Sequence, residues 1–161
     1  MINFLLQGVF VFMQLTARFR ALPMVQMGVS YWYLVATLAQ TLWLILLPFI
    51  NDWGSLTIFI VFWLTLMGLI TFQYYAPSDR PVAEYWFLKF PFEFYFAWVT
   101  VMLLGEISIT LQRQNSSPVV ILSVGILSFA IWFGGVIFVL LALTKPFYVI
   151  PTIIGLSIVS Y

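Results

Sequence analysis

The sequence contains no cysteine and no histidine. Without cysteine, the chain cannot form a disulfide bond or an iron–sulfur cluster, and it has no thiolate chemistry. Without histidine, it lacks the commonest metal ligand and the commonest general base, and it cannot hold haem through a histidine. No remaining pair of residues offers both a nucleophile and a base. We therefore expect neither a metal site nor catalytic residues, and we do not expect an enzyme.

Charged residues are also scarce. They make up 7% of the 161 residues, whereas 64% are apolar, and the mean hydropathy is +1.11. Soluble domains carry about 25% charged and about 45–50% apolar residues, so this composition excludes a soluble globule and a disordered chain. Six basic and five acidic residues are too few for a nucleic-acid-binding patch. The composition predicts a multi-pass membrane protein that contacts the lipid bilayer and has no nucleic acid partner.

Continuous apolar runs predict transmembrane helices rather than alternating strands. The polar breaks divide the chain into one all-α bundle of five to six membrane segments, at about residues 2–15, 31–50, 56–75, 90–111, 119–143 and 147–161. A spanning helix needs roughly 20 apolar residues, and the first and last segments offer only about 15 each. We interpret them either as half-spanning helices or, preferably, as the ends of a fragment of a longer protein.

Basic residues are distributed unevenly between the predicted loops. The loops after the first, third and fifth segments contain Arg18, Arg20, Arg80, Lys89 and Lys145, whereas the other loops contain only Arg113. Lysine and arginine accumulate on the cytoplasmic side of membranes. The odd-numbered loops are therefore predicted to face the cytoplasm, or the stroma or matrix of an organelle.

Two polar residues lie deep within predicted spans. Glu106 is near the middle of the fourth span, where a carboxylate costs at least about 2.5–3.5 kcal/mol unless it is neutralised or paired. It is therefore expected to face the bundle interior or a wet cavity, unless it lies nearer the membrane interface. In a functional interpretation, Glu106 contacts a ligand or carries a proton. In a structural interpretation, it forms an interhelical hydrogen bond to a backbone carbonyl or to Gln40, which is the amide at comparable depth in the second span.

Aromatic residues make up 20% of the chain. Many of the tryptophans and tyrosines cluster near predicted span ends, as in the aromatic belt of membrane proteins. Four tryptophans lie deeper, one in each long span: Trp43, Trp63, Trp98 and Trp132. A deep tryptophan can offer its flat face to a planar ligand and its N–H as a donor, but it can equally serve only as packing.

The fourth span carries a more specific pattern. Residues 90–101, FPFEFYFAWVTV, resemble the fourth-helix signature of the TspO/MBR family, the tryptophan-rich sensory and translocator proteins. Residues 39–43 resemble the family's Asn-x-x-Trp element, and residues 2–12 resemble the latter half of the first helix in longer members. The Trp-x-x-Tyr sequence that normally precedes that half is absent, which favours the interpretation as a fragment.

The resemblance implies the family's bundle of five helices, with a sixth segment in longer forms. It also implies a lipophilic pocket that takes porphyrins and other flat hydrophobic ligands. By position, Gln40, Trp43, Trp98 and Glu106 would line or brace that pocket, with Tyr95 beside it. Gln40 and Glu106 both replace an asparagine of the family pattern, which changes the polar lining.

Our leading hypothesis is a TspO/MBR-like membrane protein that binds a flat hydrophobic ligand between its helices. The ligand class includes a tetrapyrrole, a pigment such as chlorophyll or a carotenoid, a sterol and other lipids. The alternative is a structural accessory subunit of a large photosynthetic or respiratory membrane complex, in which the fold packs against other subunits. A transporter or proton channel centred on Glu106 is a third hypothesis. The sequence also leaves open a homodimer.

Overall fold

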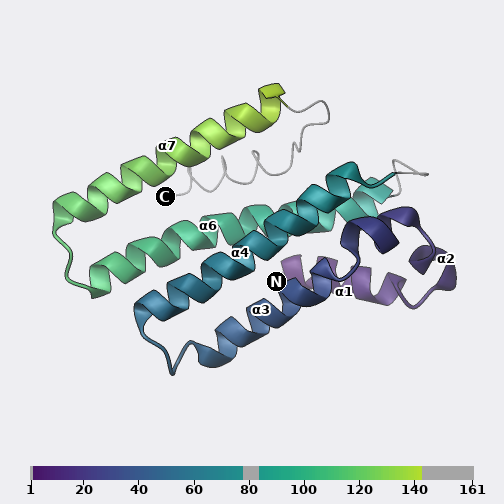
Figure 1. Cartoon of the computed structure of the whole chain (residues 1–161), viewed down its shortest axis with the longest axis horizontal. Coiled ribbons are helices and arrows are strands. Elements are labelled where there is room, and N and C mark those ends of the chain that lie inside the picture. Colours follow the sequence, from purple (N-terminus) through teal and green to yellow (C-terminus); the bar gives the residue numbers. More distant parts are fainter. Residues whose placement is uncertain (1, 78–83, 143–161) are drawn as a thin grey trace.

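The computed structural model describes residues 2–77 and 84–142. The regular secondary structure of these residues is entirely helical (Figure 1). In chain order the helices are α1 (Ile2–Met13), α2 (Ala17–Arg20), η1 (Met24–Val29), α3 (Trp32–Leu46), α4 (Asp52–Tyr75), η2 (Tyr85–Lys89), α6 (Phe90–Arg113) and α7 (Pro118–Ala142). The predicted all-α fold class is therefore confirmed for the described residues. The predicted segment 147–161 lies outside them.

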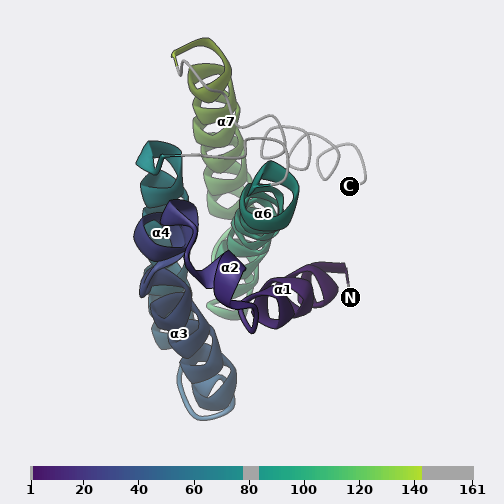
Figure 2. The ribbon, with the colours of Figure 1, turned by 90° about the vertical axis from the view of Figure 1, so that its right-hand side faces the viewer.

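Helices α4 and α6 form the antiparallel centre of the bundle. At one end, Asp52 at the start of α4 forms an ion pair of 2.8 Å with Arg113 at the end of α6. Near the other end, Gln73 Nε2 donates to the Leu88 carbonyl at 3.3 Å. Helix α3 packs along α4, while α1 and α7 lie on opposite sides of α6 (Figure 2). Every other long helix is therefore placed by its contact with this central pair.

Helix α4 begins earlier than the predicted segment 56–75. The Asn51 side chain caps it by accepting a hydrogen bond from the Gly54 N–H at 2.8 Å, which is the standard role of an asparagine before a helix. Asp52 then occupies the first turn, where a negative charge complements the helix dipole. Residues that looked like a polar break thus belong to the helix start, and Ser55 lies inside α4 rather than in a loop.

Helix α3 is shorter than the predicted segment 31–50. It comprises 15 residues and ends at Leu46, because Pro48 has no N–H to continue the helical hydrogen-bond ladder. By contrast, α4 and the continuous stretch Tyr85–Arg113, which joins η2 to α6, are long and apolar enough to cross a membrane. Helix α3 and the Pro118–Gly134 part of α7 are shorter apolar helices. The number of membrane crossings stays a prediction.

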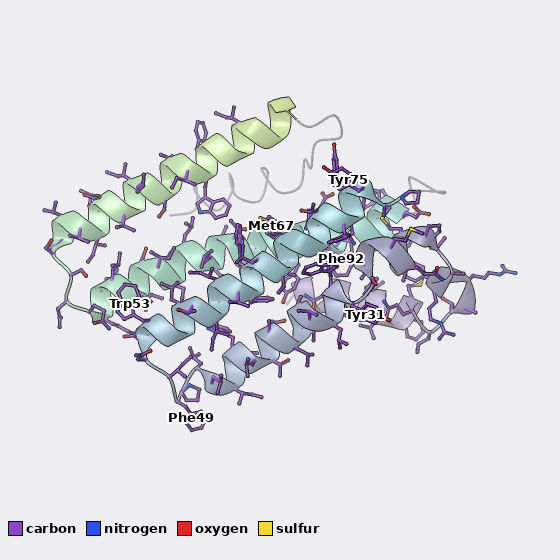
Figure 3. The ribbon with its side chains drawn as sticks, viewed as in Figure 1. Tyr31, Phe49, Trp53, Met67, Tyr75 and Phe92 are labelled. Atoms are coloured by element: carbon purple, nitrogen blue, oxygen red, sulfur yellow. The ribbon has the colours of Figure 1, made fainter. Side chains whose placement is uncertain are left out.

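Aromatic rings hold α1 against the rest of the bundle. Phe10 on α1 is fully buried and meets Tyr33 of α3 and Phe92 of α6 edge-to-face, with ring centroids 5.1 and 4.8 Å apart. Phe92 points into this interior, whereas Tyr31, Phe49 and Tyr75 lie near helix ends and point outwards (Figure 3). The bundle therefore has an aromatic interior and an apolar, aromatic exterior, which suits contact with lipid.

Candidate functional site

A chain of hydrogen bonds connects α3, α4 and α6. The Ser55 hydroxyl of α4 donates to Glu106 Oε1 of α6 at 2.8 Å, and the Trp43 indole N–H of α3 donates to the same Ser55 oxygen at 3.1 Å. Ser55 is buried, while Trp43 and Glu106 are partly buried. Glu106 thus faces the bundle interior, as expected, but its partner is Ser55 rather than Gln40 or a backbone carbonyl.

Gln40 instead forms a second polar contact on the same interface. The Tyr95 hydroxyl of α6 donates to Gln40 Oε1 of α3, and the side chain of Gln7 on α1 also lies beside that hydroxyl. Tyr95 is buried and Gln40 is partly buried. Three helices therefore bring uncharged polar groups to one point.

A series of aromatic rings joins the two polar contacts. Trp43 packs on Phe59 at a centroid distance of 4.9 Å, and Phe59 packs on Phe62 at 5.8 Å. Phe62 in turn packs on Tyr95 at 5.9 Å. We call Gln40, Trp43, Ser55, Tyr95 and Glu106, with Phe59 and Phe62 between them, the central cluster. Its two ends are polar and its middle is apolar and aromatic.

The structure brings four of the five predicted site residues into the central cluster and leaves Trp98 out. Tyr95 and Glu106 are separated by about three helical turns of 3.6 residues, so they share the face of α6 that meets α3 and α4. Trp98 follows Tyr95 by three residues on the same helix, but 47% of it is exposed. The sequence pattern alone could not separate these neighbours, because it does not show which face of α6 is covered.

The other two deep tryptophans, Trp63 of α4 and Trp132 of α7, pack against each other. Trp63 donates its indole N–H to the Thr100 hydroxyl at 2.8 Å and stacks on Phe96 with a centroid distance of 5.5 Å. Its ring also meets Trp132 of α7 edge-to-face at 5.5 Å. Trp63 therefore packs between α4, α6 and α7. Packing is one of the two roles that the sequence left open for the deep tryptophans.

Sequence reasoning did not single out Ser55, Gln7 or Glu93. Ser55 looked like part of a loop, and Gln7 lies in a helix that seemed too short to span. Glu93 lies near the start of α6, and only 2% of it is exposed. Among the described residues, no group of three acidic side chains comes together to hold a metal ion.

Comparisons with known proteins identify the family of the chain. No curated protein and no solved structure matches the chain significantly. A protein-family model described as "TSPO-like protein" matches residues 1–155, which is nearly the whole chain and confirms the resemblance found in the sequence. With its apolar helices and apolar exterior, this chain is a helical membrane protein of the TspO type, and it belongs to the TSPO-like protein family.

Proposed function

We propose that this protein binds a flat hydrophobic ligand, such as a tetrapyrrole, a pigment or a sterol, at the central cluster. The supporting observation is the convergence of Tyr95 and Glu106 on one face of α6, where each is hydrogen-bonded to a neighbouring helix. Aromatic rings lie between these two polar contacts. An apolar surface with a few polar groups at its ends is the usual make-up of a site for a flat, mostly apolar molecule.

The hydrogen bonds suggest how each group would act. The Trp43 N–H is already engaged with Ser55, so its indole would contact a ligand through the ring face rather than as a donor. Glu106 receives one hydrogen bond from Ser55, and a carboxyl group has further acceptor positions. Glu106 would therefore have capacity left for a donor group of the ligand. Apolar burial, at about 25 cal/mol per Å², would supply most of the affinity.

The test is a titration of the purified full chain in detergent with protoporphyrin IX, followed by the porphyrin Soret band. Tyr95→Ala removes both a ring and a hydrogen bond from the central cluster, so we expect it to weaken binding by about tenfold or more. Trp98→Ala is the matched control on the same helix, and we expect it to change the Kd by less than about twofold because nearly half of Trp98 is exposed. A Tyr95→Ala titration that overlays the wild type would overturn the proposal.

A second candidate function, a structural accessory subunit of a large membrane complex, rests on a different surface. Aromatic residues follow one another along the outside of η2 and α6: Trp86 contacts Phe90 at 5.3 Å, and Phe90 contacts Phe94 at 6.1 Å. Trp86 and Trp98 are 57% and 47% exposed. Such a stripe could pack against another membrane subunit, because aromatic side chains are enriched in protein interfaces.

Native gel electrophoresis of gently solubilised membranes separates the two functions. An accessory subunit comigrates with a larger complex, and the double variant Trp86→Ala/Trp98→Ala reduces that comigration. Tyr95→Ala, which alters the interior rather than the stripe, leaves it unchanged. A chain that migrates alone as a monodisperse species in mild detergent would argue against the accessory function.

A further inference from the structure

Helix α2 carries positive charge that no acidic side chain of the described residues neutralises. Its two arginines, Arg18 and Arg20, are both exposed, and neither forms an ion pair with a described residue. The other exposed charged side chain in the described part of the chain, Arg113, is paired with Asp52. None of the acidic side chains that the structure describes is exposed. The unpaired charge on the described surface is therefore positive and concentrated on α2.

Packing holds α2 in a fixed place at one end of the bundle. Phe19 lies between the two arginines in the chain, is buried, and meets the Phe10 ring of α1 edge-to-face at a centroid distance of 6.3 Å. The next helix, η1, packs on α4, where Gly28 lies against Gln73 and Ala76. The arginines are therefore presented at the end of the bundle where α4 ends (Figure 1), opposite the Asp52–Arg113 ion pair.

Large apolar side chains are exposed on both sides of α2 in the chain. Phe12 and Leu15 precede the two arginines, Met27 follows them, and all three are well exposed. Tyr75, at the end of α4, also points outwards (Figure 3). Arginines beside exposed apolar and aromatic side chains are typical of the zone where acyl chains meet lipid headgroups. This pattern places α2 at the level of the headgroups.

We infer that Arg18 and Arg20 form a binding site for the headgroups of anionic phospholipids. A guanidinium group can bind a phosphate through two hydrogen bonds, and basic residues near a membrane surface are attracted to negatively charged lipids. The neighbouring exposed apolar side chains match the acyl chains of a lipid, which a soluble anion lacks. The inference does not depend on the ligand that we propose for the central cluster, because α2 lies outside that cluster.

The test compares two lipids in native mass spectrometry of the delipidated full chain, released from detergent. Palmitoyl-oleoyl phosphatidylglycerol is anionic, whereas palmitoyl-oleoyl phosphatidylcholine has the same acyl chains and no net charge. Arg18→Gln/Arg20→Gln removes both charges from α2 and keeps polar side chains there. Arg113→Gln is the matched control, because it removes an exposed arginine that is already paired, at the opposite end of the bundle. The readout is the ratio of the two lipid Kd values in each protein.

We expect the wild type to bind phosphatidylglycerol about tenfold more tightly than phosphatidylcholine, and Arg18→Gln/Arg20→Gln to lose most of this preference. Arg113→Gln should keep it. The single variants Arg18→Gln and Arg20→Gln should each reduce the preference by about threefold, and they cover the case in which the double variant does not fold.

Three outcomes would overturn the inference. The first is a Kd ratio that is the same in the wild type and in the variants of Arg18 and Arg20. The second is an equal loss of the preference in Arg113→Gln, which would show a general effect of charge. The third is displacement of phosphatidylglycerol by inorganic phosphate, which would assign the two arginines to a soluble anion. The porphyrin titrations test the proposed function separately, so either proposal can fail while the other stands.

Discussion

Replacement of Ser55 by alanine should destabilise the bundle more than its small size suggests. The Ser55 hydroxyl is buried and serves two partners at once, because it donates to Glu106 and accepts from Trp43. Ser55→Ala removes both hydrogen bonds and leaves Glu106 and the Trp43 N–H without the partner that each has in the native bundle. Ser55 thereby connects α3, α4 and α6.

The magnitude follows from the two bonds taken separately. Interhelical hydrogen bonds in membrane proteins average about 0.6 kcal/mol, with a maximum of about 1.7 kcal/mol. We place the bond to the Glu106 carboxyl group near the upper value, because the Ser55 hydroxyl that donates it is buried and a hydrogen bond is stronger in a surrounding of low dielectric constant. The bond from Trp43 belongs near the average. We therefore expect Ser55→Ala to lower the free energy of unfolding by about 2 kcal/mol, with Glu106 as the dominant contributor.

The assay is reversible unfolding of the full chain in mixed micelles with a rising fraction of denaturing detergent. Far-UV circular dichroism reports the loss of helix at each fraction. Thr57→Ala is the matched control, because Thr57 lies two residues away on α4 but is exposed and bonds only within its own helix, to the Trp53 carbonyl. It should change the unfolding free energy by less than about 0.5 kcal/mol. Equal effects of Ser55→Ala and Thr57→Ala would refute the reasoning, as would zero coupling between Ser55→Ala and Glu106→Leu in a double-mutant cycle.

Three further predictions use the same unfolding assay. Phe10→Ala should cost about 2 kcal/mol or more, because it empties a fully buried site between α1, α3 and α6; Phe12→Ala, 72% exposed on the same helix, should not. Asn51→Ala should cost about 1 kcal/mol through loss of the α4 cap, and Asn51→Asp should restore it. Arg113→Gln should leave the unfolding midpoint unchanged at high salt, since the ion pair of Arg113 with Asp52 is solvent-exposed. A large drop in the unfolding midpoint at high salt would contradict this prediction.

The helical membrane class and the family could be predicted from residue content and one motif. The apolar composition required helices wherever the chain enters lipid, and FPFEFYFAWVTV pointed to the TspO/MBR family before any geometry was known. Helix ends were predicted less well where a capping residue was taken for a break, as at Asn51, or where a proline ended a helix early, as at Pro48. The side-chain cap of Asn51 and the missing N–H of Pro48 explain these two differences in the helix ends.

The membership of the central cluster depended on the tertiary structure. Motif spacing nominated Tyr95, Trp98 and Glu106 alike, but only packing shows that α3 and α4 cover the face of α6 with Tyr95 and Glu106 and leave Trp98 exposed. Ser55 belongs to no recognised motif, and its importance arises from its hydrogen-bond partners on two other helices. The amino-acid sequence by itself determined that the chain is a bundle of apolar helices, because burial of backbone polar groups in lipid leaves few alternatives. Which polar side chains meet inside that bundle was decided by how the helices rotate and pack against one another, and that depends on contacts between residues far apart in the chain.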